Sequence, residues 1–101
     1  MASNLIHISG TILDEDMECS LRELCRICNI EIELVREMVE EGLIRPRGSE
    51  PTYWRFTAIE IRRVQTSLRL QKDLRINLPG CALILDLLEE IEELRCRNKI
   101  R

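Results

Sequence analysis

SLRELCRICNIEIELVREMVEEGLI, residues 20–44, decides the fold of this 101-residue chain. Ser20 and Glu23 form a capping box, which predicts a first helix that runs to about Cys28. Asn29 favours a short turn, after which a second helical pattern begins at once. Two short helices joined by a tight turn are typical of a helix-turn-helix unit.

The second helix is expected over residues 31–41, and Gly42 is a natural residue to end it. Apolar residues recur at helical spacing in both helices, which predicts one buried face on each. In the first helix they are Leu21, Leu24, Cys25 and Cys28. In the second helix we expect burial of Ile32, Val35 and Val39, with Met38 flanking them.

Residues 45–51, RPRGSEP, are rich in turn formers and predict the tip of a β-hairpin, or wing. Its two strands would be residues 43–44 and 52–56. Alternation along the second strand places Trp54 and Phe56 on one side, which we expect to cover the helical core.

The segment before the helices predicts one or two short strands, over residues 5–8 and 11–13. Gly10 lies in the turn between them. Residues 14–18 are mostly acidic and are expected to form a solvated link.

Thr57 and Glu60 form a second capping box, which opens a helix over residues 58–74. At about 100° per residue this helix has two opposite apolar faces. One face carries Ile61, Val64 and Leu68, and the other carries Ile59, Leu70 and Leu74. We therefore expect it to be packed from two sides, between the winged core and the following segment.

Asn77 is the candidate N-cap of a last helix that runs to about Lys99, with Pro79 in its first turn. An a/d seam of 3-4-3 spacing is formed by Ile84, Leu87, Ile91 and Leu94. Asn98 takes the next a position. So short a seam must pack on the preceding helix, on a second copy of itself, or on both. We favour a homodimer, because the helix has more apolar surface than one neighbour would cover.

The composition, 45% hydrophobic and 33% charged with a net charge of -3, indicates a folded soluble domain. We divide this single domain into an N-terminal strand region (1–18), the helix-turn-helix with its wing (19–57) and a two-helix part (58–101). We expect no signal peptide, because residues 1–4 have no basic or long apolar stretch, and no apolar run approaches the roughly 20 residues that span a membrane. We expect a mainly α protein in the cytoplasm, with no membrane partner.

The five cysteines favour reduced thiols that act as apolar fillers. Cys25 and Cys28 have the C-x-x-C spacing, but a zinc site would need a second ligand pair, and a redox motif would need a βαβ setting. The sequence has no nucleophile–base pair and no phosphate-binding glycine loop. We therefore expect that the protein is not an enzyme and that it has no catalytic residue, no cofactor and no metal.

The outward face of the second helix is acidic. It carries Glu33, Glu37 and Glu40, and Arg36 is the only cation of that helix. Because DNA-reading helices carry cations and amides, this face would repel phosphate, and we do not expect DNA as the partner. A plain solvated face is the alternative interpretation.

Basic residues are concentrated instead on the wing and on the helix that follows it. They could contact phosphate, as in a DNA-binding transcription regulator, or pair with the acidic last helix. These residues are Arg45, Arg47, Arg55, Arg62, Arg63, Arg69, Lys72 and Arg75.

Residues 21–25, 35–46 and 53–56 resemble the winged helix-turn-helix of MerR-type regulators. More closely, residues 5–94 are similar to the chaperone-modulator family typified by CbpM. The most telling stretches are Trp54-Arg55-Phe56, Leu68-Arg69-Leu70 and Asn77-Leu78-Pro79-Gly80. The resemblance implies a MerR-like fold and a protein partner, the J-domain of a DnaJ-like co-chaperone of the CbpA type. Family members occupy that J-domain, so that it no longer stimulates the Hsp70 DnaK, and they reduce the DNA binding of CbpA.

J-domains present a basic helix, so an acidic surface of this chain would be complementary to it. Charge alone selects two candidate surfaces for partner binding. They are Glu33, Glu37 and Glu40 on the second helix, and Asp86, Glu90 and Glu93 on the last helix. The carboxylate-rich second helix departs from the pattern of MerR regulators that read DNA.

Overall fold

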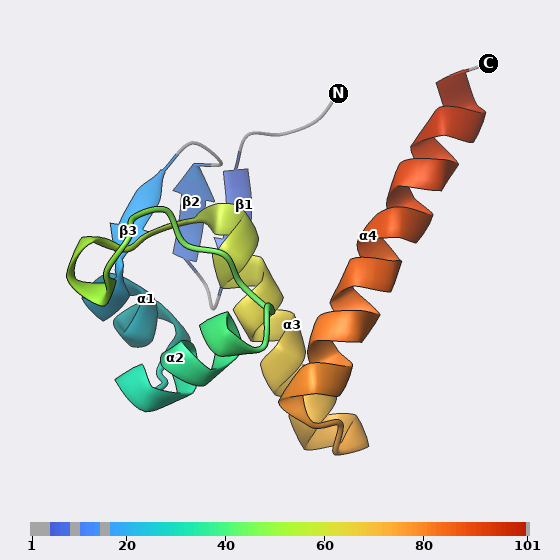
Figure 1. Cartoon of the computed structure of the whole chain (residues 1–101). Coiled ribbons are helices and arrows are strands. Elements are labelled where there is room, and N and C mark those ends of the chain that lie inside the picture. The colour runs from blue at the N-terminus through green and yellow to red at the C-terminus, as the bar shows by residue number, and fades with distance from the viewer. Residues whose placement is uncertain (1–4, 9–10, 15–16, 101) are drawn as a thin grey trace.

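The computed structural model describes residues 5–8, 11–14 and 17–100, and the side chains of residues 17–98. The elements follow in the order β1 (Leu5–Ile8), β2 (Thr11–Asp14), β3 (Glu18–Ser20), α1 (Leu21–Cys28), α2 (Ile32–Glu40), a 3-10 turn (Pro51–Tyr53), β4 (Arg55–Thr57), α3 (Ala58–Leu74) and α4 (Leu78–Ile100). In Figure 1, α3 lies between the helix-turn-helix on one side and α4 on the other. The predicted mainly α fold, with a pair of long C-terminal helices, is confirmed.

The helix-turn-helix is fixed by local hydrogen bonds at the helix ends. The backbone N–H of Glu23 donates to Ser20 Oγ (3.2 Å), and Glu23 Oε1 accepts from the backbone N–H of Ser20 (2.8 Å), so the predicted capping box is present. At the end of α2, Gly42 has a φ of +77° and the N–H of Leu43 donates to the carbonyl of Met38 (2.9 Å). This is a Schellman motif, which directs the chain out of α2 and into the wing.

The buried face of α2 differs from the prediction at one residue. Val35 and Met38 are fully buried and Val39 is half-buried, whereas Ile32 is 41% exposed. Burial of Ile32 was therefore a wrong prediction. Around the helix axis, Ile32 points about 90° away from the direction midway between Val35 and Met38. When Val35 and Met38 face the core, Ile32 therefore lies at its rim.

The wing is less regular than the predicted hairpin. β4 pairs antiparallel with β3, with Cys19 opposite Phe56, and residues 43–44 form no strand. Only an isolated bridge, Arg47 to Arg55, joins the two sides of the wing. Pro51 begins a 3-10 turn that also occupies residues 52–53. The strand that was expected over residues 52–56 therefore begins only at Arg55.

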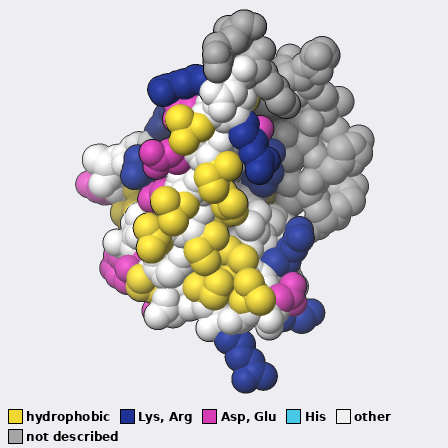
Figure 2. Space-filling model, turned by 90° about the vertical axis from the view of Figure 1, so that its right-hand side faces the viewer, with side chains coloured by type: hydrophobic (Ala, Val, Ile, Leu, Met, Phe, Trp, Pro, Cys, Tyr) yellow, Lys and Arg dark blue, Asp and Glu magenta, His cyan; other side chains and the backbone are white. Residues whose placement is uncertain are grey.

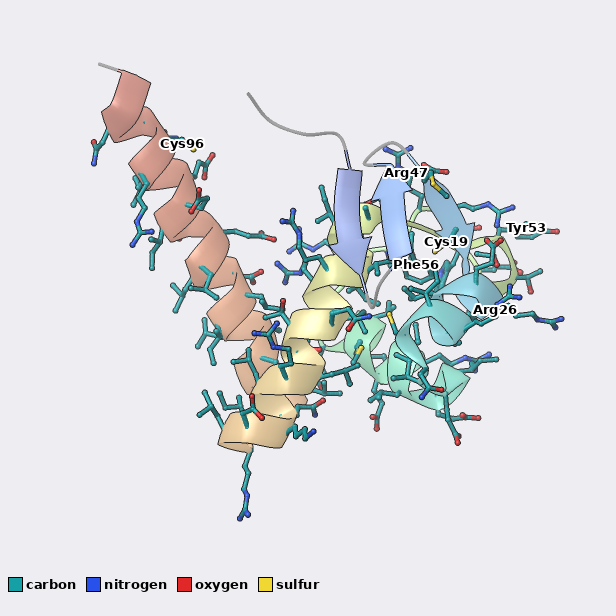
Figure 3. The ribbon with its side chains drawn as sticks, turned by 180° about the vertical axis from the view of Figure 1, so that it is seen from behind. Cys19, Arg26, Arg47, Tyr53, Phe56 and Cys96 are labelled. Atoms are coloured by element: carbon teal, nitrogen blue, oxygen red, sulfur yellow. The ribbon has the colours of Figure 1, made fainter. Side chains whose placement is uncertain are left out.

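Glu18 was expected in a solvated link and lies in β3 instead, where it forms an ion pair with Arg47 (2.9 Å). The alternation predicted for the wing residues is confirmed. Phe56 is fully buried and Trp54 is half-buried, with their rings 6.0 Å apart in a T-shaped arrangement. Tyr53 is exposed on the wing (Figure 3).

α3 begins at the predicted capping box, in which Glu60 Oε1 accepts from the backbone N–H of Thr57 (2.8 Å). Ile61 and Val64 are buried, as predicted for one face. The opposite face was expected to be covered too, but Ile59 is 53% and Leu74 is 64% exposed. α4 contacts α3 at Arg63 and Ser67, so α3 is packed from two sides as predicted. The two ends of its second face nevertheless stay exposed, while Leu70 is half-buried.

α4 begins after Asn77, whose Oδ1 accepts from the backbone N–H of Gly80 (2.9 Å), as predicted for an N-cap. Its first turns pack on α3 through Cys81, Ala82 and Leu85, which are buried. Beyond them α4 extends away from the rest of the molecule (Figure 1). Within the described residues, no helix is both long and apolar enough to cross a membrane.

Candidate protein-binding surfaces

The outward face of α2 is an exposed acidic surface. Glu33, Glu37 and Glu40 are all exposed and lie on the side of the helix opposite Val35 and Met38. Within the described part of the chain these three carboxylates form no ion pair. Their charges are therefore free to act on a partner.

The carboxylates at the two ends of α2 extend this acidic field. Glu31 and Glu41 are exposed, and Arg36 is the only cation between them. The half-exposed Ile32 adds an apolar side chain at the edge of the same face. A surface of this composition is suited to a basic protein partner rather than to a phosphate backbone.

The basic residues of the wing are partly neutralised within the chain. Arg47 forms the ion pair with Glu18, and Arg55 is close enough to Glu23 to act on its charge. The pKa of Glu23 is lowered, mainly by the hydrogen bond from the backbone N–H of Ser20, with smaller effects of Arg26 and Arg55. In Figure 3, Arg47 and Tyr53 lie at the outer edge of the wing, while Phe56 points inward.

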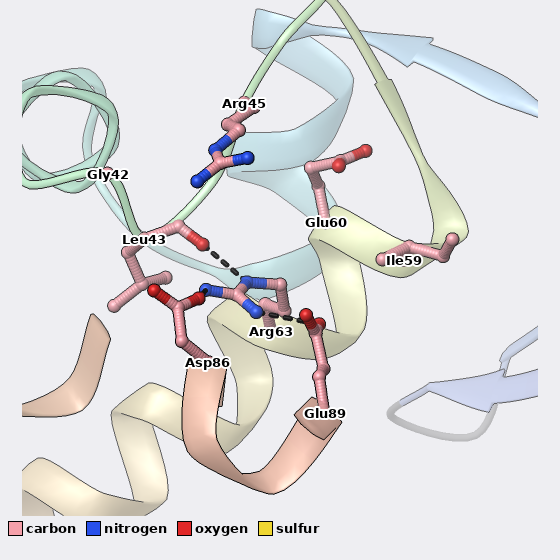
Figure 4. A pocket seen from close by; sticks show the side chains of 8 residues that line it. All are labelled: Gly42, Leu43, Arg45, Ile59, Glu60, Arg63, Asp86 and Glu89. Atoms are coloured by element: carbon pink, nitrogen blue, oxygen red, sulfur yellow. Dashed lines mark hydrogen bonds and ion pairs between the residues drawn. The ribbon is translucent and has the colours of Figure 1, made fainter. Parts of the chain in front are cut away.

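Arg63 joins three elements at the base of α4. Its side chain is 11% exposed, and its Nε donates to the backbone carbonyl of Leu43, just after α2 (Figure 4). Its two terminal nitrogens form ion pairs with Asp86 (3.0 Å) and Glu89 (2.6 Å). Pairing between the basic residues of α3 and the acidic last helix, one of the two predicted alternatives, is thus found for Arg63.

This arrangement separates the acidic candidates on α4. Asp86 is held by Arg63, whereas Glu90 and Glu93 are exposed and make no ion pair among the described residues. Together with Arg45 and Arg97, these carboxylates line an open groove of about 360 Å³ beside the start of the wing. Of the three candidate residues on α4, Glu90 and Glu93 are therefore free to bind a partner, whereas Asp86 is already paired.

The predicted seam of α4 is largely uncovered. Ile84 is half-buried, while Leu87, Ile91 and Leu94 are between 45% and 49% exposed. They lie on the side of α4 opposite the residues that pack on α3. Figure 2, which views the molecule from the α4 side, shows hydrophobic side chains gathered in one band on this face.

The C-x-x-C thiols lie in an environment that keeps them protonated. Burial raises the pKa of Cys28 to about 12, and burial also raises the pKa of Cys25. A metal ligand or redox nucleophile requires the thiolate, which is scarce at neutral pH when the pKa is raised. Among the described residues, no group of three or more His, Cys, Asp or Glu side chains could hold a metal ion.

Two functional features were missed in the sequence. The link from Arg63 to the end of α2 depends on residues 20 positions apart, and only its acidic partners on α4 could be anticipated from charge. The exposed ends of the second face of α3, at Ile59 and Leu74, were assigned to packing, because the apolar spacing is the same whether a neighbour covers a residue or not.

Comparison with known proteins agrees with this architecture. Residues 19–100 match the family described as MerR HTH family regulatory protein. Chaperone modulatory protein CbpM of Coxiella burnetii (strain Dugway 5J108-111) is 39% identical over 90 residues, which cover 89% of this chain and 85% of the relative. Its namesake in Pseudomonas entomophila (strain L48) is 31% identical over 93 residues, which cover 92% of this chain and 89% of the relative. The chain belongs to the CbpM family of chaperone modulatory proteins, and its fold is that of the MerR helix-turn-helix regulators.

Proposed function

We propose that this chain binds the J-domain of a DnaJ-like co-chaperone of the CbpA type and inhibits that co-chaperone by occupying its J-domain. The observation that carries the proposal is the exposed acidic face of α2, at Glu33, Glu37 and Glu40, in the position where a DNA-binding relative would read bases. Membership of the chaperone modulatory family supports a partner in the chaperone system.

Electrostatics favours α2 as the contact. The basic helix of a J-domain would meet five exposed carboxylates and one arginine on α2 and its two ends. On α4, by comparison, Arg63 already neutralises Asp86 and Glu89. We therefore place the J-domain on α2 and regard Glu90 and Glu93 as the weaker candidate.

The same features weigh against the alternative of a DNA-binding transcription regulator. Its phosphate contacts would come from the wing and α3, where Arg47 and Arg63 are engaged in ion pairs within the chain. The net charge of -3 would add a general repulsion from the phosphate backbone.

We also propose that the protein acts as a homodimer in the cytoplasm. The half-exposed seam residues Leu87, Ile91 and Leu94 support self-association, because such a long apolar helix face is unusual on a monomer. A J-domain target supports the cytoplasm as the compartment in which the two proteins meet.

Titration of the purified chain with the J-domain of its co-chaperone, followed by calorimetry, tests the proposal. We expect saturable binding whose affinity falls as salt is raised, because the contact is between opposite charges. Duplex DNA titrated in the same low-salt buffer is the control. An absence of heat with the J-domain, together with salt-sensitive binding of DNA, would support the transcription regulator instead.

A further inference from the structure

We propose that Arg63 is a positioning residue for the acidic face of α2. It holds the C-terminal end of that helix in the orientation that the J-domain binds, and Asp86 and Glu89 of α4 hold Arg63 in place. Arg63 lies outside the acidic face itself, and this role rests on the proposed function. Figure 4 shows its guanidinium group between the carbonyl of Leu43 and the two carboxylates.

The carbonyl that accepts from Arg63 belongs to the end of α2. The N–H of Leu43 donates to the carbonyl of Met38 (2.9 Å), and Gly42, with its φ of +77°, turns the chain at this point. This Schellman motif ties Leu43 to the last turn of α2. A hydrogen bond to the Leu43 carbonyl therefore fixes the position of the whole last turn.

α2 has no cation of its own at this end. Its last turn contains no basic residue, while Glu37, Glu40 and Glu41 bring three exposed carboxylates to it. Negative charge is unfavourable at the C-terminus of a helix, because the helix dipole is negative there. Arg63 supplies a positive charge from another helix, so α2 can keep an acidic outer face.

α2 and α4 meet at this residue although each packs mainly on another helix. α2 packs most extensively on α1, and α4 packs most extensively on α3. Arg63 is on α3, and its side chain reaches both the end of α2 and the carboxylates of α4. A change at the base of α4 can therefore be transmitted to the end of α2.

The burial of Arg63 explains why its position depends on the two carboxylates. Its side chain is only 11% exposed, and all three guanidinium nitrogens donate hydrogen bonds. A nearly buried charge without a counter-ion is costly. If Asp86 and Glu89 lost their charges, the guanidinium group would turn toward water and release the Leu43 carbonyl.

Calorimetric titration of the full chain with the J-domain tests this role in two variants. Arg63→Gln, and separately Asp86→Asn with Glu89→Gln, should each raise the dissociation constant at least roughly threefold. The second variant changes only exposed side chains, so it serves as the test if Arg63→Gln does not fold.

The direction of the change in Arg63→Gln separates positioning from simple charge. This substitution removes a positive charge and frees two carboxylates, so charge alone would make a basic partner bind more tightly. Positioning predicts weaker binding. Tighter or unchanged binding by a folded Arg63→Gln variant would overturn the inference.

Two controls match these variants. Glu90→Gln with Glu93→Gln removes two charges from the same helix, but these carboxylates are exposed and make no ion pair among the described residues. Thr57→Ala removes the N-cap of α3 and lowers stability far from the Leu43 carbonyl. Both should leave the dissociation constant within about twofold of the wild type. If Thr57→Ala weakened binding as much as Arg63→Gln, the effect would be one of stability and the inference would be wrong.

Backbone amide spectra of the free chain separate this inference from the proposed function. Signals of residues 39–44 should move in Asp86→Asn with Glu89→Gln, and not in Glu90→Gln with Glu93→Gln. If they move as expected and the J-domain does not bind even the wild type, Arg63 holds the end of α2 and the proposed partner is wrong. If they do not move and the J-domain binds every variant equally, the role of Arg63 is wrong and the partner stands.

Discussion

Phe56→Ala is expected to lower the free energy of unfolding by about 3–5 kcal/mol, the usual cost of removing a large buried aromatic side chain. Phe56 is fully buried, lies opposite Cys19 across the β3–β4 ladder, and contacts Trp54 edge to face. Its ring therefore anchors the wing and the strand before α1 on the same core. Truncation would leave a cavity where these elements meet.

Equilibrium unfolding in urea measures the effect, and Tyr53→Ala is the matched control on the same segment. Tyr53 is 67% exposed, so its truncation should cost less than about 1 kcal/mol. Equal effects of the two substitutions would mean that Phe56 is not the buried anchor of the wing.

The second large effect is expected on partner binding. Glu33→Lys, Glu37→Lys and Glu40→Lys combined should weaken J-domain binding at least roughly tenfold, because each attractive contact worth a few tenths of a kcal/mol or more becomes repulsive. All three side chains are exposed, so the fold should be retained. The remaining affinity should also depend less on salt than that of the wild type.

Calorimetry at two salt concentrations measures this effect, with circular dichroism to verify that α2 is intact. Glu90→Lys with Glu93→Lys is the comparison, because it reverses exposed charges on the other acidic candidate surface. If this pair weakened J-domain binding and the α2 variant did not, the contact would lie on α4 and the assignment to α2 would be wrong.

Features that depend on neighbouring residues were predictable from the sequence. The capping boxes at Ser20 and Thr57, the glycine at position 42 and the N-cap at Asn77 each act within one helical turn, and the structure has all four. For the same reason the starts of α1, α3 and α4 agree with the prediction. Both ends of α2 agree with it to within one residue.

Features that depend on distant residues were not predictable in this way. β4 pairs with β3, which lies more than 30 residues earlier, and neither three-residue strand has a pattern that identifies its partner. From its charge alone, Arg63 could bind either DNA phosphate or the carboxylates of α4. Only the packing of α3 on α4 shows that it binds the carboxylates. The exposed acidic face of α2 was predictable, because helical periodicity alone separates it from Val35 and Met38.

In the proposed complex, a fold usually used to read DNA presents its second helix to a basic protein partner. The most direct test is nuclear magnetic resonance of the isotope-labelled chain during titration with the unlabelled J-domain. We predict that the largest shifts of backbone amide signals lie in α2 and its ends, Glu31 to Glu41, while signals of the wing change little. Shifts confined to the wing around Arg47 and Arg55, or to Glu90 and Glu93 on α4, would contradict binding of the J-domain to α2.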